Sequence, residues 1–459
     1  MENKNLTEGS ILKSLLLLAL PIMGTAFVQM AYNLTDIMWV GRLGSRAVAS
    51  VGTAGFFTWF AMAPIFISKI GAEVGIAQSV GREDYSGAKR HIRYALQTTI
   101  GLAIIYGLIL IIFKGPLIAF FNLKEVDVVK NAELYLVIIA ANMIFFFLNP
   151  VFTAVLNGYG QSNKPFIINS IGLVVNMILD PILILGIGRI PAYGIKGAAI
   201  ATVAAQVIVT LIFIYYLKVH TSSFEDLKLI KSIEIDRLIN FMKLGLPVAL
   251  QSGLFTIIAM IIARFIAEWG PVPVAVQKIG SQIEAISWAT ASGFSTAVST
   301  FVGQNYGAGK WERIRKGYES AFRFIGLVGI ITSLLLVFAG EQIFSLFIQE
   351  EDAIKEGIVY LRILGYSQFF MCIEITTAGA FNGLGRTIPP SIVGIVFNAI
   401  RIPSVIILSG VIGLNGIWWS ISLTSIFKGI IITMWFVMAL RKYLPNDIEL
   451  TAVTSTVEV

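Results

Sequence analysis

The sequence predicts an all-α integral membrane protein, with twelve transmembrane helices in two pseudo-symmetric bundles of six. Its apolar residues come in long blocks, and each block reaches the roughly 20 residues that a helix needs to cross a bilayer. Only 13% of the residues are charged, whereas soluble proteins have about 25%. Strands of membrane barrels alternate apolar and polar residues, so these uniform blocks indicate helices. The third observation, an internal repeat, divides the helices into two equal sets.

The apolar blocks follow one another along the whole chain. The first block, at about 11–40, is too long for the core of a signal peptide and has no cleavage pattern, so we expect a retained span. The predicted spans are 12–40, 47–76, 90–113, 132–157, 163–187, 194–217, 238–268, 273–302, 317–339, 354–382, 388–410 and 414–440. The predicted domains are an N-terminal lobe at 12–217, a cytoplasmic linker at 218–237, a C-terminal lobe at 238–440 and a cytoplasmic tail at 441–459.

The two halves of the sequence are related by an internal repeat. "LALPIMG" in the first half corresponds to "LGLPVAL" in the second, which places Pro21 over Pro247 at an offset of 226. Further matches at offsets of 226, 225 and 222 are Gln78 with Gln304, Gly81 with Gly307, "NGYGQSNKP" with "NGLGRTIPP", Asn176 with Asn398, and Pro181 with Pro403. Because each half has an even number of spans, both halves enter the membrane from the same side. Such parallel repeats are typical of secondary transporters.

Basic residues gather in the links after the second, sixth and eighth spans. This pattern places those links and both termini in the cytoplasm of a cell whose plasma membrane the chain crosses many times. It also accounts for the formal net charge of +7 without a nucleic-acid partner. The residues concerned are Arg82, Lys89, Arg90, Arg93, Lys218, Lys228, Lys231, Arg237, Lys243, Lys310, Arg313, Arg315 and Lys316.

Two acids lie deep in the predicted spans of the first half. A charge near the bilayer centre costs on the order of 2.5–3.5 kcal/mol, so Asp36 and Asp180 are functional candidates. Asn176 comes four residues before Asp180 and therefore shares its helix face. Gln29, Tyr32 or Asn33, and Asp36 are spaced three to four residues apart, so they share one helix face. This spacing predicts a supporting polar face on the first span.

Prolines near these acids predict bends in their helices. Pro181 cannot donate a backbone hydrogen bond, and its ring crowds the carbonyl group of Met177. The fifth span should therefore bend beside Asp180 and leave a carbonyl oxygen free. Pro21 predicts a second bend, in the first span.

The polar groups around the two acids predict a site for a coupling cation. Asp36, Asp180, Asn176 and the hydroxyl of Thr202 offer the oxygen ligands that a hard cation such as Na⁺ prefers. A proton fits as well, because two carboxylates in a dry cavity repel each other and one then retains a proton more readily. The alternative is that both acids are structural and satisfied by neighbouring polar groups. No cofactor other than Na⁺ or H⁺ is expected.

A second polar cluster is predicted in the second half. Its members are Gln277, Gln282 and Glu284 in the eighth span, Glu374 in the tenth and Arg401 in the eleventh. They form either an ion or substrate site or a structural pair, since Glu374 or Glu284 can pair with Arg401. The sequence contains no Walker motif and no HExxH or GxSxG pattern, so neither ATP drive nor an embedded enzyme is indicated.

Several segments, taken together and in order, resemble the multidrug and toxic compound extrusion (MATE) family. They are "LALPIMGTAFVQMAYNLTDIMWVGRLG", "AQSVG", "NGYGQSNKP", "NMILDP", "GAAIATVAAQ" and "VGQNYGAGK". The resemblance implies a V-shaped antiporter of two six-helix bundles that expels cationic or amphipathic drug-like compounds in exchange for Na⁺ or H⁺. It also implies that Asp36 and Asp180 are the acids of an N-lobe cation site, as in the branch named after the DNA-damage-inducible protein F.

The chain departs from one branch of that family. The norfloxacin-extruding and eukaryotic members have an acid in the seventh span, where this chain has Phe255. The N-lobe is therefore the better candidate for coupling. We expect a monomeric multidrug efflux antiporter in the lipid bilayer. One alternative is a flippase for lipid-linked oligosaccharides, which would need a strongly cationic cavity, whereas the deep charges of this chain include more acids than bases. A more remote alternative is a membrane-embedded enzyme.

Overall fold

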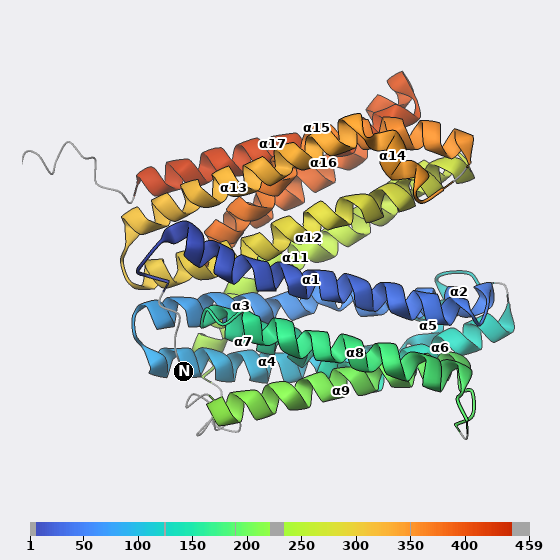
Figure 1. The fold of residues 1–459 in the computed structure, drawn as a ribbon, viewed down its shortest axis with the longest axis horizontal. Coiled ribbons are helices and arrows are strands. Elements are labelled where there is room, and N and C mark those ends of the chain that lie inside the picture. The colour runs from blue at the N-terminus through green and yellow to red at the C-terminus, as the bar shows by residue number, and fades with distance from the viewer. Residues whose placement is uncertain (1–5, 124, 189, 221–233, 349, 443–459) are drawn as a thin grey trace, which may run out of the picture. The chain divides into compact units, whose positions relative to one another are not determined.

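The structure is a computed structural model that describes residues 6–123, 125–188, 190–220, 234–348 and 350–442 (Figure 1). The regular elements of these residues are α-helices, apart from one isolated bridge between Ile187 and Ile190. These helices confirm the all-α class. Most of the predicted linker and tail lie outside the described residues, as do Lys228 and Lys231.

The helices of the first half lie between Ile11 and His220, and those of the second half between Ile235 and Arg441. The first set is α1 (Ile11–Gly41), α2 (Ser45–Phe60), α3 (Met62–Gly81), α4 (Tyr85–Ile112), α5 (Lys114–Ala119), α6 (Val126–Ala141), α7 (Met143–Gly158), α8 (Asn163–Leu185) and α9 (Gly194–His220). The second set is α11 (Ile235–Ala267), α12 (Pro271–Gly307), α13 (Trp311–Phe338), α14 (Gly340–Ser345), α15 (Glu351–Gly383), α16 (Ile388–Ile412) and α17 (Leu414–Arg441).

Each predicted span corresponds to one long helix or to two consecutive helices. Ten spans of the described residues are long and apolar enough to cross a membrane, with α2 and α3 counted as one. An eleventh is the pair α6 and α7, which meet at a bend of 52°. The twelfth, α12, is 37 residues long, but its polar side chains keep it outside the apolar set. Glu284 lies in this span.

The described residues form two compact units. Unit 1 consists of residues 20–253, and unit 2 combines residues 6–19 with 254–442. The predicted lobes divide in the linker, whereas these units divide inside α1 and α11. In α1 the division falls between Ala19 and Leu20, next to Pro21. The first helix of each half therefore begins in the opposite unit.

The residues before α1 are bound to the corner between α12 and α13, all within unit 2. The side chain of Gln304 accepts a hydrogen bond from the Leu6 amide at 3.3 Å, and Asn305 donates to the Leu6 carbonyl at 3.2 Å. Arg313 donates to the carbonyls of Leu6, Glu8 and Gly9, and Lys310 donates to that of Thr7. Four consecutive carbonyl groups of this N-terminal segment, Leu6–Gly9, are thus held by side chains of the second half.

Glycine contacts show that the sequence repeat is also a repeat of packing. A Cβ atom added to Gly158 of α7 would lie 3.0 Å from the Glu73 carbonyl oxygen and 3.0 Å from the Ile76 Cβ of α3. In unit 2, a Cβ atom on Gly383 of α15 would meet the Ser299 carbonyl and lie 2.8 Å from the Val302 Cβ of α12. Glu73 and Ile76 correspond to Ser299 and Val302 at the offset of 226, so the same close helix contact occurs once in each unit.

A close glycine contact in unit 1 yields a stability prediction. A Cβ atom on Gly197 of α9 would collide with the carbonyl group of Leu183 at the end of α8 and lie 3.0 Å from the Ile184 nitrogen. We expect Gly197→Ala to lower the free energy of unfolding by about 1–3 kcal/mol, as overpacking does. Thermal unfolding of the purified protein measures this. Gly55→Ala, a helical site with open space around it, is the control and should unfold at the wild-type temperature or slightly above. An equal loss in both variants would contradict the prediction.

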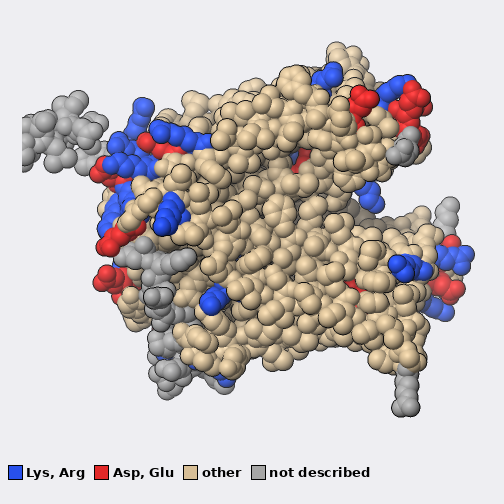
Figure 2. Space-filling model, viewed as in Figure 1, with Lys and Arg blue, Asp and Glu red and all other residues tan. Residues whose placement is uncertain are grey.

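Charge is confined largely to the ends of the helices in each unit. Figure 2 shows the acidic and basic side chains gathered there, with an almost uncharged face between. On α4, Ile105, Leu108 and Ile112 are 57%, 51% and 67% exposed. Such exposed apolar side chains are satisfied by lipid chains, and the helices satisfy their backbone groups internally. The surface is that of a membrane-spanning protein.

Candidate functional site

The polar residues predicted for the first half meet inside unit 1. Asp36 comes from α1, Asn176 and Asp180 from α8, and Thr202 from α9. Asn176 Nδ2 donates to Asp180 Oδ1 at 3.2 Å, and Thr202 Oγ1 donates to Asp36 Oδ2 at 3.5 Å. The two carboxyl groups are also close enough to interact with each other. Three helices distant in sequence thus bring four oxygen-bearing side chains to one place, which we call the unit 1 oxygen cluster.

Three residues of this cluster are buried and Asp36 is half-buried, and several of the oxygen atoms have no partner. Asp180 and Asn176 are fully buried, and Thr202 is 5% exposed. Among the described residues, no hydrogen-bond donor reaches Asp36 Oδ1, Asp180 Oδ2 or Asn176 Oδ1. Buried acceptor atoms without a donor are costly, so this arrangement favours a guest that carries positive charge. A dehydrated Na⁺ or a shared proton fits this set of oxygens.

The other predicted residues of unit 1 are divided between the cluster and the surface. Tyr32 is 7% exposed, and its hydroxyl donates to the Thr202 carbonyl at 3.5 Å. Gln29 and Asn33 lie on the same helix but are exposed. Tyr135 of α6, which the sequence did not single out, is buried beside Asp36 and Thr202. No sequence signal separates this tyrosine from an ordinary core residue.

Both predicted bend positions lie within continuous helices. Pro21 is inside α1 and Pro181 inside α8, next to Asp180. The Thr25 hydroxyl donates to the Pro21 carbonyl at 3.0 Å, one turn along the helix. Each proline removes one backbone hydrogen bond from its helix, and both helices continue past that point.

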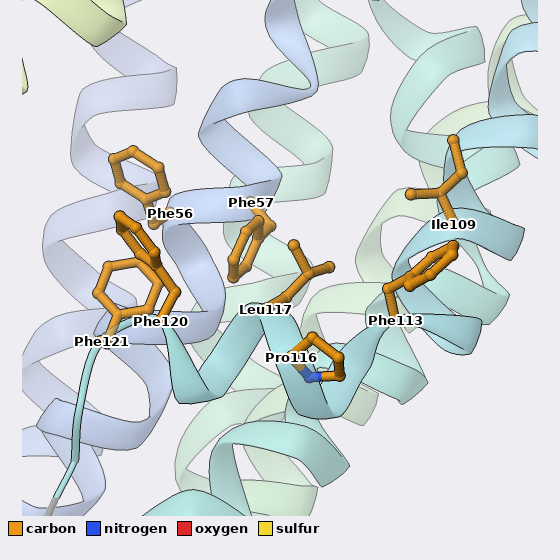
Figure 3. Close-up of a pocket in the computed structure, with 8 residues that line it drawn as sticks. All are labelled: Phe56, Phe57, Ile109, Phe113, Pro116, Leu117, Phe120 and Phe121. Atoms are coloured by element: carbon orange, nitrogen blue, oxygen red, sulfur yellow. The ribbon is translucent and has the colours of Figure 1, made fainter.

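An apolar pocket elsewhere in unit 1 has a different character. It has a volume of about 360 Å³ and is lined by Phe56, Phe57, Ile109, Phe113, Pro116, Leu117, Phe120 and Phe121 (Figure 3). The ring of Phe121 lies 5.7 Å from that of Phe56 and 5.9 Å from that of Phe57. This lining offers no charged or oxygen ligand side chain, so the pocket is not the cation site.

Glu284 is held by neutral partners in unit 2. Tyr360 donates to its Oε2 at 3.3 Å, and Gln368 donates to its Oε1 at 2.9 Å. Gln368 in turn accepts a hydrogen bond from Ser287 at 2.9 Å. Tyr360 and Gln368 lie on α15, three helices after Glu284 along the chain, and no local sequence pattern predicts that they meet it. The acid is thus placed by an α12–α15 contact.

Neither Glu374 nor Glu284 forms the ion pair with Arg401 that the sequence left open as one alternative. Glu374 pairs instead with Lys428 of α17, at 3.1 Å. Arg401 donates to the hydroxyls of Thr424 and Ser425 at 2.8 and 2.9 Å. The reason is the register of α16 against α17. It places the hydroxyls of Thr424 and Ser425 beside the Arg401 guanidinium, whereas Lys428 of α17 lies beside the Glu374 carboxylate.

The remaining two residues of the predicted second cluster stand apart from it. Gln277 is half-buried and Gln282 is exposed, both on α12. The structure therefore buries Glu374 and Arg401 inside unit 2, leaves Glu284 half-buried and places Gln282 at the surface.

The helices that Glu374 and Lys428 join are also joined in unit 1. Glu374 corresponds to Asn149 of α7 at the offset of 225, and α17, which carries Lys428, is the last helix of its half as α9 is of the first. Asn149 Nδ2 donates to Gln206 Oε1 at 2.7 Å, and the Thr210 hydroxyl donates to Asn149 Oδ1 at 2.7 Å. Each unit therefore ties the same two helices together, with amides and a hydroxyl in unit 1 and an ion pair in unit 2. This common helix contact favours a structural role for the pair.

Comparison with known families matches both halves of the chain. The family model described as MatE matches residues 21–182 and again 247–407. The two matches begin at Pro21 and Pro247, the positions that the internal repeat places over each other. Together they cover more than half of the chain.

Individual relatives match over nearly their whole length. The chain is 28% identical to a probable multidrug resistance protein NorM of Thermotoga maritima, over 93% of this chain and 92% of the relative. It is 24% identical to an FAD transporter of Shewanella oneidensis, over 94% and 95%. A crystal structure of MATE in complex with MaD5 matches the fold with a TM-score of 0.87 at 24% identity, over 96% and 99%. The chain therefore belongs to the multidrug and toxic compound extrusion (MATE) family of membrane transporters.

Proposed function

We propose that the chain is an antiporter that exports cationic or amphipathic xenobiotics in exchange for Na⁺ or H⁺. The observation that carries this proposal is the unit 1 oxygen cluster, in which three buried oxygen atoms lack a donor. A cation or a proton would satisfy them. Relatives named as multidrug resistance or export proteins support multidrug export, and one relative is named as an FAD transporter.

Coupling follows from competition for the same negative charge. When Asp36 and Asp180 are both ionised and empty, a cationic substrate is attracted to unit 1. When Na⁺ or H⁺ binds them, that attraction is lost, so the ion and the substrate bind antagonistically. We propose that neutralisation also lets α1 bend near Pro21 and α8 near Pro181, which closes the N-lobe cavity and releases substrate.

We propose that the basic helix ends face the cytoplasm. In unit 1, Arg82, Lys89 and Arg90 lie at the corner between α3 and α4, and in unit 2, Lys310 and Arg313 lie at the corresponding corner between α12 and α13. Loops rich in Lys and Arg remain on the cytoplasmic side of a plasma membrane. Both termini are then cytoplasmic, and the chain acts as a monomer in the lipid bilayer.

The test is ethidium transport by the purified protein in liposomes, under an imposed Na⁺ gradient or an imposed pH gradient. We expect one gradient to drive ethidium against its concentration, and transport to stop when an ionophore dissipates that gradient. Transport driven by neither gradient would contradict the antiporter. Movement of a lipid-linked oligosaccharide without any gradient would favour a flippase.

A further inference from the structure

Arg401 is a buried cation whose hydrogen-bond partners are all neutral. Its side chain lies on α16 and is 7% exposed. Its Nε donates to the Thr424 hydroxyl, and its Nη2 donates to the Ser425 hydroxyl. Within the described part of the chain, no carboxylate lies at ion-pair distance from it. Buried charges in proteins are normally paired, because an unpaired charge is costly to remove from water.

The acids nearest to Arg401 are engaged elsewhere. Glu374 is in contact with Lys428, and Glu284 accepts hydrogen bonds from Tyr360 and Gln368. Both carboxylates attract the guanidinium, from beyond ion-pair distance. A guanidinium has five N–H donors in a planar fork, and the two hydroxyl contacts use two of them. Arg401 thus retains donors for a further oxygen acceptor.

The repeat places Arg401 at the level of the acidic site of the other unit. Asn176 and Pro181 correspond to Asn398 and Pro403 at an offset of 222, so the counterpart of Asp180 is Ile402, beside Arg401. Asp36 corresponds to Ile262 at the offset of 226. Unit 1 therefore carries two acids at these positions, whereas unit 2 carries apolar residues and an adjacent arginine. The stretch of α16 that corresponds to the acidic stretch of α8 therefore has no acid and has an arginine at the position of Leu179.

We propose that Arg401 is a binding residue for the carboxylate of an anionic or zwitterionic compound. The planar fork of arginine matches a carboxylate in two parallel hydrogen bonds, which lysine cannot reproduce. Thr424 and Ser425 act as positioning residues, because their hydroxyls fix the orientation of the guanidinium. The export of such a compound rests on the proposed function, but its binding to Arg401 does not require coupled transport.

A pair of fluorescent probes that differ in one carboxylate tests the proposal. Rhodamine 110 has a free carboxyl group, and rhodamine 123 is its methyl ester with the same cationic ring system. Binding to the full chain in lipid nanodiscs is followed by fluorescence polarisation without any ion gradient. We expect the wild type to bind the acid more tightly than the ester. Arg401→Gln should lower affinity for the acid by roughly 10- to 150-fold, the effect of losing hydrogen bonds to a charged group, and leave the ester within about twofold.

Two further variants make the result specific. Arg401→Lys keeps the charge without the fork, so it should retain part of the preference for the acid, and it serves as the test if Arg401→Gln does not fold. Arg264→Gln removes one positive charge from an exposed position of α11 in unit 2 and should leave both affinities unchanged. The proposal is overturned if the wild type shows no preference for the acid, or if the Arg401 variants weaken both probes equally. Failure of gradient-driven ethidium transport would contradict the antiporter and not this site.

Discussion

Replacing Asp36 with asparagine is expected to abolish gradient-driven efflux of ethidium. The amide keeps the shape of the side chain and its contact with Thr202, but it removes one of the two negative charges of the unit 1 oxygen cluster. A coupling free energy of 1–3 kcal/mol corresponds to about 5–150-fold in affinity, so its loss should bring transport close to the rate of protein-free liposomes. The measurement is ethidium flux under whichever gradient drives the wild type.

Two companion variants separate coupling from folding. Asp180→Asn should have the same effect, since both carboxylates contribute to one site. Gln29→Ala changes an exposed polar residue of the same helix, α1, and should transport at the wild-type rate. Thermal unfolding should show that all three variants remain folded. Unimpaired efflux in Asp36→Asn would refute the assignment of this site.

Replacing Glu374 with glutamine is expected to cost about 3–5 kcal/mol of stability, the effect of breaking a buried ion pair on one side. The ammonium group of Lys428 is 3.1 Å from Glu374 and only 9% exposed, so it would be left as an uncompensated buried charge. Arg401 would also lose an attractive neighbour. Thermal or denaturant unfolding of the purified variant measures the loss.

The double variant Glu374→Gln/Lys428→Met tests whether this pair is a structural tie. Removing both charges should restore most of the stability, because a buried pair contributes little beyond an apolar contact of the same size. It should also leave ethidium transport near the wild-type rate. Glu351→Gln, which breaks an exposed pair with Lys355 on the same helix, is the control and should unfold as the wild type does. A double variant that is stable but inactive would instead place the pair in the transport site.

The membrane fold could be predicted from the length of the apolar segments, because the thickness of the bilayer sets how long a spanning helix must be. The repeat added the division into two halves, and the glycine pair Gly158 and Gly383 reproduces that repeat in the packing of helices. The compact units could not be predicted from it. The units divide inside α1 and α11 because each of these helices packs against different helices along its length. The sequence of a helix does not reveal which other helices it contacts at each point.

The candidate sites show a similar limit. Asn176 and Asp180 could be placed on one face because four residues make about one helical turn, and they are hydrogen-bonded in the structure. Tyr135, Tyr360 and Gln368 approach the acids from other helices, so no local spacing predicts them. The partner of Glu374 could not be predicted for the same reason. Two cations on neighbouring helices were available, and only the register between the helices decides that Lys428 is the closer one.

The N-terminal segment has a consequence for how the protein is made. A ribosome produces Leu6 long before the side chains that bind it, Gln304, Asn305 and Arg313, which lie in the second half of the chain. The backbone groups of Leu6 therefore cannot form these hydrogen bonds until most of the described chain has been synthesised and inserted. Residues made early thus form their native contacts late, so the docking of this segment indicates that the second half has been built.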